Sequence, residues 1–165
     1  MTSAADTVIQ DKTQPKRGLA HEALAVFLGS WSAEGTSYGG ADQSGGDPRA
    51  NGVPWVSEHR GYWHTGRFFL VQDERARLGG EVFDTLSIMG VEAETGMYFA
   101  RGFENHGFYR NYPVTRDENV WKVNGDIERA MITFGDDNRT QTIAWEWRPK
   151  GEWLPLCDRV ATRID

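Results

Sequence analysis

The chain has 165 residues, of which 39% are hydrophobic and 25% charged, a composition typical of a soluble globular protein. Its formal net charge of -6 argues against nucleic acid as a partner, because a phosphate backbone requires a basic face. The N-terminus lacks the apolar segment of a secretory signal, and no stretch approaches the roughly 20 apolar residues of a membrane-spanning helix. We therefore expect a cytoplasmic protein with neither a membrane nor a nucleic-acid partner.

The N-terminal part of the chain predicts a tail and a helix. Residues 1–17 are polar and are expected to be a flexible tail, which leaves a single domain over residues 18–165. Leu19–Gly29 places apolar residues at helical spacing and ends in a glycine, which predicts a short helix. A first strand is expected over residues 30–40. The long Gly- and Pro-rich loop that follows, residues 41–54, is a candidate lid.

Further strands are expected at short, regular spacing. Turn signals such as Gly79-Gly80 and Asn124-Gly125 separate most of them. The expected ranges are 55–64, 67–78, 81–91, 96–104, 107–115, 119–124, 128–134, 140–148 and 153–163. A meander of this length removes its edges by closing on itself. The predicted fold class is therefore all-β: an antiparallel up-and-down, lipocalin-like barrel of about ten strands with a short N-terminal helix.

Two tight turns align three of these strands and separate two faces. With Thr65-Gly66 as a two-residue hairpin loop, His59 pairs with Gln72, and with Gly79-Gly80 as the next loop, Gln72 pairs with Ser87. One face then holds nearly all of the charge and is assigned to solvent. The other face is assigned to the interior and carries Trp55, Ser57, His59, Gly61, Trp63, Phe68, Leu70, Gln72, Glu74, Ala76, Phe83, Thr85, Ser87 and Met89.

His59 is the first candidate functional residue. It is expected in a polar row with Gln72 and Ser87, surrounded by apolar side chains, which is the character of a small-molecule site. Its imidazole can orient a ligand or act as an acid or base. The alternative is a core histidine whose hydrogen bonds go to Gln72 or Ser87.

The segment from Phe99 to Tyr112 is the second candidate. The expected turn at Asn105–Gly107 would lie at a mouth of the barrel, surrounded by Arg101, Glu104, His106, Tyr109 and Arg110. Arg101 can bind an anionic group, and Glu104 with His106 can move a proton. The alternative is a solvated hairpin tip with an ordinary Arg–Glu pair.

Metal and cofactor chemistry has little support. The four histidines show no ligand spacing such as HxH, and Cys157 is alone, so no internal disulfide can form. The default for Cys157 is a buried, inert thiol. We expect neither a metal nor a cofactor.

Two stretches resemble known families. "FLGSWSAEGTSYGG" (27–40) resembles the LxGxWxGxG opening of calycin-type barrels, the nitrobindin and fatty-acid-binding-like group. "GRFFLVQDERARLGG" with the following "TGMYFARGFENHG" resembles the core of the bacterial DUF1579 family, a family of unknown function. The resemblance implies a ligand-binding barrel with Trp31 at its base. It does not carry over the nitrobindin-like heme ligand, because the last stretch, "WLPLCDRVATRID", contains no histidine.

These observations lead to two main functional hypotheses. The first is the binding of a small apolar or aromatic molecule inside the barrel. The walls would be formed by Trp31, Trp63, Phe68, Leu70 and Met89. The polar anchors would be His59, Gln72 and Ser87, with Arg101 near the mouth.

The second hypothesis is a cofactor-free lyase, isomerase or cyclase that uses the same cavity. His59 or Glu104 would be the acid or base, and Arg101 or Tyr109 would stabilise a developing oxyanion. Heme binding is a third hypothesis, with less support because the last stretch lacks a histidine. We also expect a homodimer, an expectation that rests only on the predicted class of fold, a barrel with aromatic-rich strands.

Overall fold

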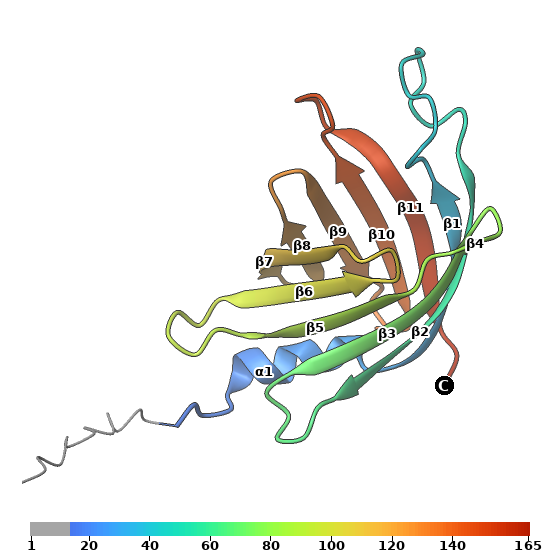
Figure 1. Ribbon diagram of the computed structural model, residues 1–165. Helices are drawn as coiled ribbons and strands as arrows, with labels where there is room; N and C mark the ends of the chain where they lie inside the picture. The colour runs from blue at the N-terminus through green and yellow to red at the C-terminus, as the bar shows by residue number, and fades with distance from the viewer. Residues whose placement is uncertain (1–13) are drawn as a thin grey trace, which may run out of the picture.

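A closed antiparallel barrel is formed by the chain in the computed structural model, which describes residues 14–165 (Figure 1). A short helix, α1 (Leu19–Ala23), continues directly into a 3-10 turn (Leu24–Phe27). The strands are β1 (Gly29–Ser37), β2 (Val53–Trp63), β3 (Leu70–Leu78), β4 (Glu81–Val82), β5 (Thr85–Val91), β6 (Tyr98–Glu104), β7 (Tyr109–Asp117), β8 (Val120–Asn124), β9 (Glu128–Phe134), β10 (Thr140–Trp147) and β11 (Leu154–Arg163).

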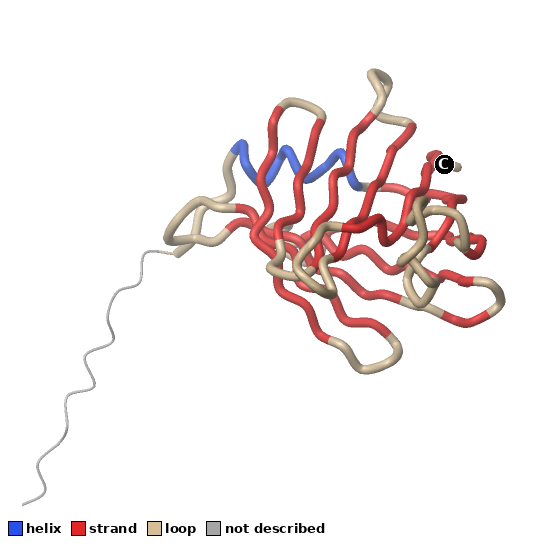
Figure 2. The backbone as a smooth tube through the Cα atoms, turned by 90° about the horizontal axis from the view of Figure 1, so that it is seen from above, coloured by secondary structure: helices blue, strands red, loops and turns tan. Residues whose placement is uncertain are grey.

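The strands follow one another around the barrel in chain order. Each long strand pairs antiparallel with its neighbours along the chain, and β3 pairs with β5 beyond the two-residue β4. The barrel closes because β1 pairs with β11 on one side and with β2 on the other. Figure 2 shows the ring of strands from above, with the helical segment along one side. The predicted up-and-down barrel of about ten strands with a short N-terminal helix is confirmed.

One end of the barrel is filled by the helical segment (Figure 1). Phe27 packs edge-to-face on Trp121 and Phe134, with ring centroids 5.1 and 5.0 Å away. Trp31 is fully buried beside them. Gly61 on β2 permits this approach, because a Cβ atom there would lie 2.0 Å from the carbonyl oxygen of Phe27. We call this packed end the plug: Leu24, Phe27, Trp31, Trp121 and Phe134.

The β2–β3 connection differs from its prediction. It is a six-residue loop rather than a two-residue turn, and Gly66 and Arg67 adopt positive φ angles of 88° and 59°. The register therefore moves by two residues, so that His59 pairs with Glu74 rather than with Gln72. A shift by an even number leaves the residues that remain in the two strands on their predicted faces, whereas Phe68 now lies in the loop. The β3–β5 register, with Gln72 opposite Ser87, is as predicted.

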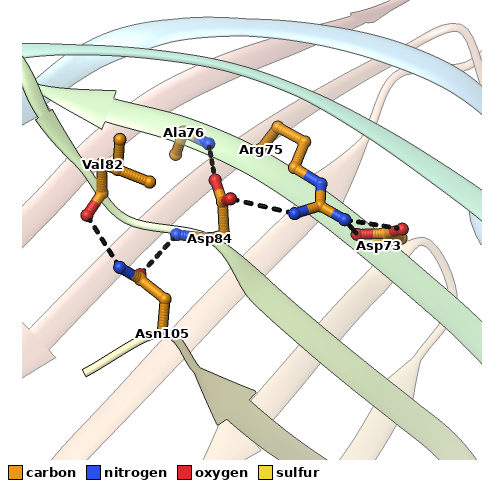
Figure 3. A network of polar contacts seen from close by, with 6 residues as sticks. All are labelled: Asp73, Arg75, Ala76, Val82, Asp84 and Asn105. Atoms are coloured by element: carbon orange, nitrogen blue, oxygen red, sulfur yellow. Dashed lines mark hydrogen bonds and ion pairs between the residues drawn. The ribbon is translucent and has the colours of Figure 1, made fainter. Parts of the chain in front are cut away.

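The strand expected over 81–91 is interrupted at Phe83 and Asp84, and side chains from three segments hold this break (Figure 3). The Asn105 amide donates to the Val82 carbonyl at 3.2 Å and accepts from the Asp84 backbone N–H at 2.7 Å. The Asp84 carboxylate accepts from the backbone N–H of Ala76 and from Arg75. These bonds replace the ladder bonds that a continuous strand would make.

Most of the predicted tail lies outside the described residues, which begin at residue 14. Arg17, at its end, donates to the Arg67 carbonyl at 2.9 Å and lies 5.2 Å from the centre of the Trp63 ring.

Within residues 14–165, no helix is long and apolar enough to cross a membrane. The cytoplasmic location and the homodimer stay predictions.

Gly61→Ala is expected to destabilise the barrel by about 1–3 kcal/mol, because the new methyl group overlaps the Phe27 carbonyl and must displace the plug. Urea unfolding measures the change. The matched control is Gly102→Ala in the same barrel, where the nearest atom to a Cβ is the Ser87 hydroxyl at 3.8 Å. If the two variants unfold alike, the close approach at Gly61 does not constrain the plug.

Candidate functional site

The barrel interior holds a cavity of about 460 Å³. Its aromatic lining comprises Phe27, Trp55, Phe83, Phe108, Tyr112, Trp145 and Trp147. Its polar and charged lining includes His59, Gln72, Glu74, Ser87, Glu104, Arg110, Glu128, Gln141 and Arg159. The cavity therefore combines an aromatic wall with polar groups at separate places, as small-molecule sites do.

A buried ion pair crosses one wall of the cavity. The Arg159 Nη1 atom lies 2.9 Å from the Glu74 carboxylate, and the two side chains retain only 11% and 15% of their exposure. The Ser57 hydroxyl donates to the same Glu74 oxygen at 2.8 Å, and the indole N–H of Trp55 donates to the Ser57 hydroxyl at 3.0 Å. Each charge thus has an opposite charge or a hydrogen bond beside it, as burial of charge requires.

The position of Arg159 depends on a glycine. Arg159 on β11, Gly35 on β1 and Trp55 on β2 are neighbours across the sheet. A Cβ atom on residue 35 would lie 2.0 Å from the Asp158 carbonyl oxygen and 2.6 Å from the Arg159 Cβ. Because this space is free, the Arg159 guanidinium lies over the Trp55 ring, 4.3 Å from its centre, and reaches β3.

His59 is buried at the inner side of the same wall. Its ring stacks on Trp31, with centroids 6.0 Å apart and planes 9° apart. Burial lowers the pKa of His59 from 6.5 to about 4; the Glu74 carboxylate opposes this shift and the Arg159 guanidinium adds to it. The imidazole is therefore neutral at pH 7.

A second cluster of polar side chains lies on β7 and β9 and consists of Arg110, Tyr112 and Glu128. The Tyr112 hydroxyl donates to the Glu128 carboxylate at 2.8 Å, and Arg110 Nε lies 3.5 Å from the same oxygen. Burial raises the pKa of Tyr112 far above its ordinary value, and the Glu128 charge adds to the rise. Tyr112 thus remains a neutral phenol, whose hydroxyl donates a hydrogen bond to Glu128.

Three residues of the lining each carry a fully buried nitrogen atom that has no hydrogen-bond partner within residues 14–165: Nδ1 of His59, Nε2 of Gln141 and Nε of Arg159. Such atoms are rare in folded proteins, because each costs free energy when it is removed from water.

Several predicted site residues do line the cavity. These are His59, Gln72, Ser87, Met89 and Glu104. They do not form the predicted row, because the register places His59 beside Glu74 and Gly61 beside Gln72. No hydrogen bond joins His59 to Gln72 or Ser87 in the structure of residues 14–165.

The other four predicted wall residues lie in the packed core, against it or in the β2–β3 loop rather than around the cavity. Trp31 and Leu70 are fully buried in the core, and Trp63 packs against it from the rim. Phe68 belongs to the β2–β3 loop, where it packs edge-to-face on His21 with centroids 5.4 Å apart. Of the five predicted wall residues, only Met89 lines the cavity.

Arg101 and Tyr109 lie on the outer surface of the barrel. Arg101 is exposed, 3.7 Å from Glu92 and above the Phe99 ring. Tyr109 is 54% exposed and stacks on Phe103. The strand alternation points their neighbours inward instead, so Gly102 and Arg110 line the cavity.

Glu104 lies at the mouth of the cavity and holds the β6–β7 turn. Its carboxylate accepts from the backbone N–H groups of His106 and Phe108 at 3.0 and 2.9 Å, and it contacts the His106 ring at 2.6 Å. Burial raises the pKa of Glu104, but these hydrogen bonds outweigh it, and the net shift is downward. This carboxylate is an acceptor that organises the turn.

The sequence interpretation named Arg110 beside the β6–β7 turn but gave it no role, and it missed Tyr112, Glu128, Gln141 and Arg159 as site residues. For Arg110 and Tyr112 a signal existed, since they alternate with Tyr109 along one strand. For Arg159 the signal is weak, because its inward charge contradicts the rule that charges face solvent.

Cys157 is buried beside Trp55, and burial raises the pKa of its thiol to about 11. The predicted buried thiol is therefore protonated at pH 7. Within the part of the chain that the structure describes, no three His, Cys, Asp or Glu side chains gather in a metal-binding arrangement.

Comparison with known proteins supports the fold. The chain is similar to the crystal structure of Rv2717c from M. tuberculosis, with a TM-score of 0.63 and 13% sequence identity over 91% of this chain and 100% of that chain. At this identity the likeness shows the shared barrel alone. Neither the protein-family models nor the curated proteins include a match. The resemblance to the DUF1579 family is therefore not confirmed.

Arg159→Met is expected to destabilise the protein by about 3 kcal/mol, because it leaves the Glu74 carboxylate buried without its cation. Urea unfolding at pH 7 measures the change. The double variant Glu74→Gln/Arg159→Met should recover most of the loss, since neither charge then remains buried. Equal losses in the single and double variants would mean that the two charges do not stabilise each other.

His59 is expected to make stability fall with acid. The unfolded chain takes up the histidine proton near pH 6.5 and the folded chain only near pH 4, so the stability is fully present above pH 6.5 and is lost as the pH falls toward 4. The loss attributable to His59 is about 2–3 kcal/mol between pH 7.5 and pH 4.5. Urea unfolding of the wild type and of His59→Gln at both pH values isolates it. Parallel pH profiles would contradict the burial of a neutral imidazole.

Proposed function

We propose that this protein binds a small molecule with an apolar or aromatic body inside the barrel. The single observation that carries the proposal is the interior cavity of about 460 Å³, whose mainly apolar lining includes seven aromatic side chains. Ligand pockets in proteins span roughly 300–1,000 Å³ and are lined mainly by apolar and aromatic side chains.

The construction of the interior supports the same proposal. A small barrel without a ligand site fills its interior with packed side chains, as Phe27, Trp31 and Phe134 do in the plug. At the cavity the inward positions instead carry small or polar residues, such as Ser87, Ala100 and Gly102. Their small size keeps the space open between the aromatic walls.

The long connection between β1 and β2, residues 38–52, is attached to the barrel beside this space. Gln43 donates to the Pro155 carbonyl at 2.7 Å and accepts from the indole N–H of Trp147 at 2.9 Å. Arg49 pairs with Asp158 at 2.8 Å. Because Trp147 also lines the cavity, the loop supports one cavity wall directly.

A cofactor-free lyase, isomerase or cyclase is the second candidate. The observation that favours it is His59, which lines the cavity as a neutral imidazole and can accept a proton. The pKa of about 4 makes this imidazole a weak base at pH 7. Binding therefore ranks first, and turnover would need a substrate with an acidic proton.

The first experiment is native mass spectrometry of the purified protein, followed by equilibrium dialysis against a panel of neutral aromatic compounds. A retained mass or saturable binding at one site per chain is the expected result. Absence of both across the panel would contradict the proposed function.

Gly102→Phe is expected to raise the Kd of the ligand at least tenfold. Gly102 lies on β6, between β5 and β7, and lines the cavity, so the new ring would occupy the space of the ligand. Asn111→Phe is the matched control. Asn111 is exposed on the neighbouring strand, so the same ring is added outside the barrel. Thermal unfolding verifies that both variants fold. Unchanged binding in folded Gly102→Phe would place the ligand outside the cavity.

A further inference from the structure

Two polar side chains of the cavity lining, Gln72 on β3 and Ser87 on β5, are directed into the barrel. Leu86, the residue before Ser87, is 41% exposed on the outer face, so the alternation of side chains turns Ser87 inward. Gln72 is paired directly with Ser87 and therefore lies on the same face of the sheet. Both side chains line the cavity and remain partly exposed, so their exposed surface faces this space.

The hydrogen-bonding capacity of these two side chains is unused. Neither the Gln72 amide nor the Ser87 hydroxyl has a hydrogen-bond partner within residues 14–165, yet neither belongs to the fully buried polar atoms that lack a partner there. Their polar atoms are therefore accessible from the cavity. A side-chain amide offers donors and an acceptor, and a hydroxyl also offers both.

Gly102 leaves the space beside this pair of side chains open. It is paired with Ser87 across the sheet and also lines the cavity. A Cβ atom on residue 102 would have the Ser87 hydroxyl oxygen, 3.8 Å away, as its nearest neighbour. A ligand group that occupies the space over Gly102 therefore lies beside Ser87, with Gln72 on the next strand.

The charges around this pair favour an uncharged ligand group. In the next inward row, Glu74 on β3 and Glu104 on β6 lie on either side of β5. A ligand carboxylate at the pair would approach both of these carboxylates, at a cost in free energy. Glu74 already pairs with Arg159, and Glu104 is bonded to the β6–β7 turn, so neither is a free partner for a ligand cation. On the β7 side, Arg110 lies 3.5 Å from Glu128, which compensates its positive charge.

We propose that the ligand carries an uncharged group that both donates and accepts hydrogen bonds, such as a primary amide or an alcohol, and that this group binds over Gly102 to the Gln72 amide and the Ser87 hydroxyl. This inference rests on the proposed binding function and names its ligand class. The apolar body of the ligand extends toward Met89 and Ala100, which are paired in the adjacent inward row and line the cavity on the side of the plug.

Probes with one aromatic body and different polar groups test the ligand class. 2-Naphthamide carries the uncharged amide, 2-naphthoate carries a negative charge, and 2-naphthylmethylamine carries a positive charge. Their affinities for the full chain are measured by equilibrium dialysis at pH 7.5. We expect the amide to bind at least fivefold more tightly than either charged probe, because both charged probes would lose hydration without gaining a free counter-charge.

Substitutions test the two assigned side chains. Gln72→Met keeps the length of the side chain and removes its amide, and Ser87→Ala removes the hydroxyl. Each should weaken 2-naphthamide about threefold to tenfold, the contribution of one hydrogen bond. The affinity for 2-isopropylnaphthalene, which has the shape of the amide without its hydrogen bonds, should change less than twofold. Asn111→Met is the matched control, because it removes an exposed amide on the outer face of β7 and should leave both affinities unchanged.

The outcomes separate the two proposals. Tighter binding of a charged probe, or an unchanged amide affinity in the folded variants, would overturn the ligand class and leave the proposed binding function standing. Failure of every naphthyl probe and of the wider aromatic panel would overturn the binding function itself. The comparison of charged and uncharged probes uses the wild-type protein, so it stands even if neither variant folds.

Discussion

The Glu74–Arg159 ion pair is the interaction on which the character of the barrel interior depends. It joins β11 to β3 across two intervening strands, β1 and β2, at the place where the barrel closes. Taking two charges out of water is costly, and their attraction offsets the cost only when further hydrogen bonds complete the site. Ser57 and Trp55 supply such bonds, and Gly35 supplies the space for the long side chain. A packed hydrocarbon core would be at least as stable in this position, so stability alone does not account for the pair.

The two ends of the barrel solve different physical problems. At the plug, Phe27 and Trp31 fill the interior with rings, and Gly61 admits the backbone of the helical segment. Dense packing of this kind supplies most of the apolar burial of a small barrel. At the other end the aromatic rings stand around a space rather than in it. His59 lies between the two regions, stacked on Trp31 and lining the cavity, so that the rigid plug fixes the orientation of a group that faces the space.

The alternation of side chains made the fold and the inward faces predictable, but exact neighbours were not. Charge assigned the outer face of the second and third strands correctly, and the two-residue register shift did not alter it, because it was even. The identity of the shifted partner was out of reach, since a six-residue loop with Arg67 at positive φ has no simple sequence signature. Arg159 and Glu128 were missed for a different reason. Inward charges violate the pattern that identifies a face, and only their three-dimensional pairing explains them.

The charged side chains of the cavity lining lie in pairs of opposite sign. Arg159 is held by Glu74 at 2.9 Å, and Arg110, which is about a third exposed, lies 3.5 Å from Glu128. The groups left over are single hydrogen-bonding atoms on Gln141, His59 and Arg159. Under the proposed function, the aromatic side chains of the lining would supply most of the affinity, because buried rings contribute large apolar area.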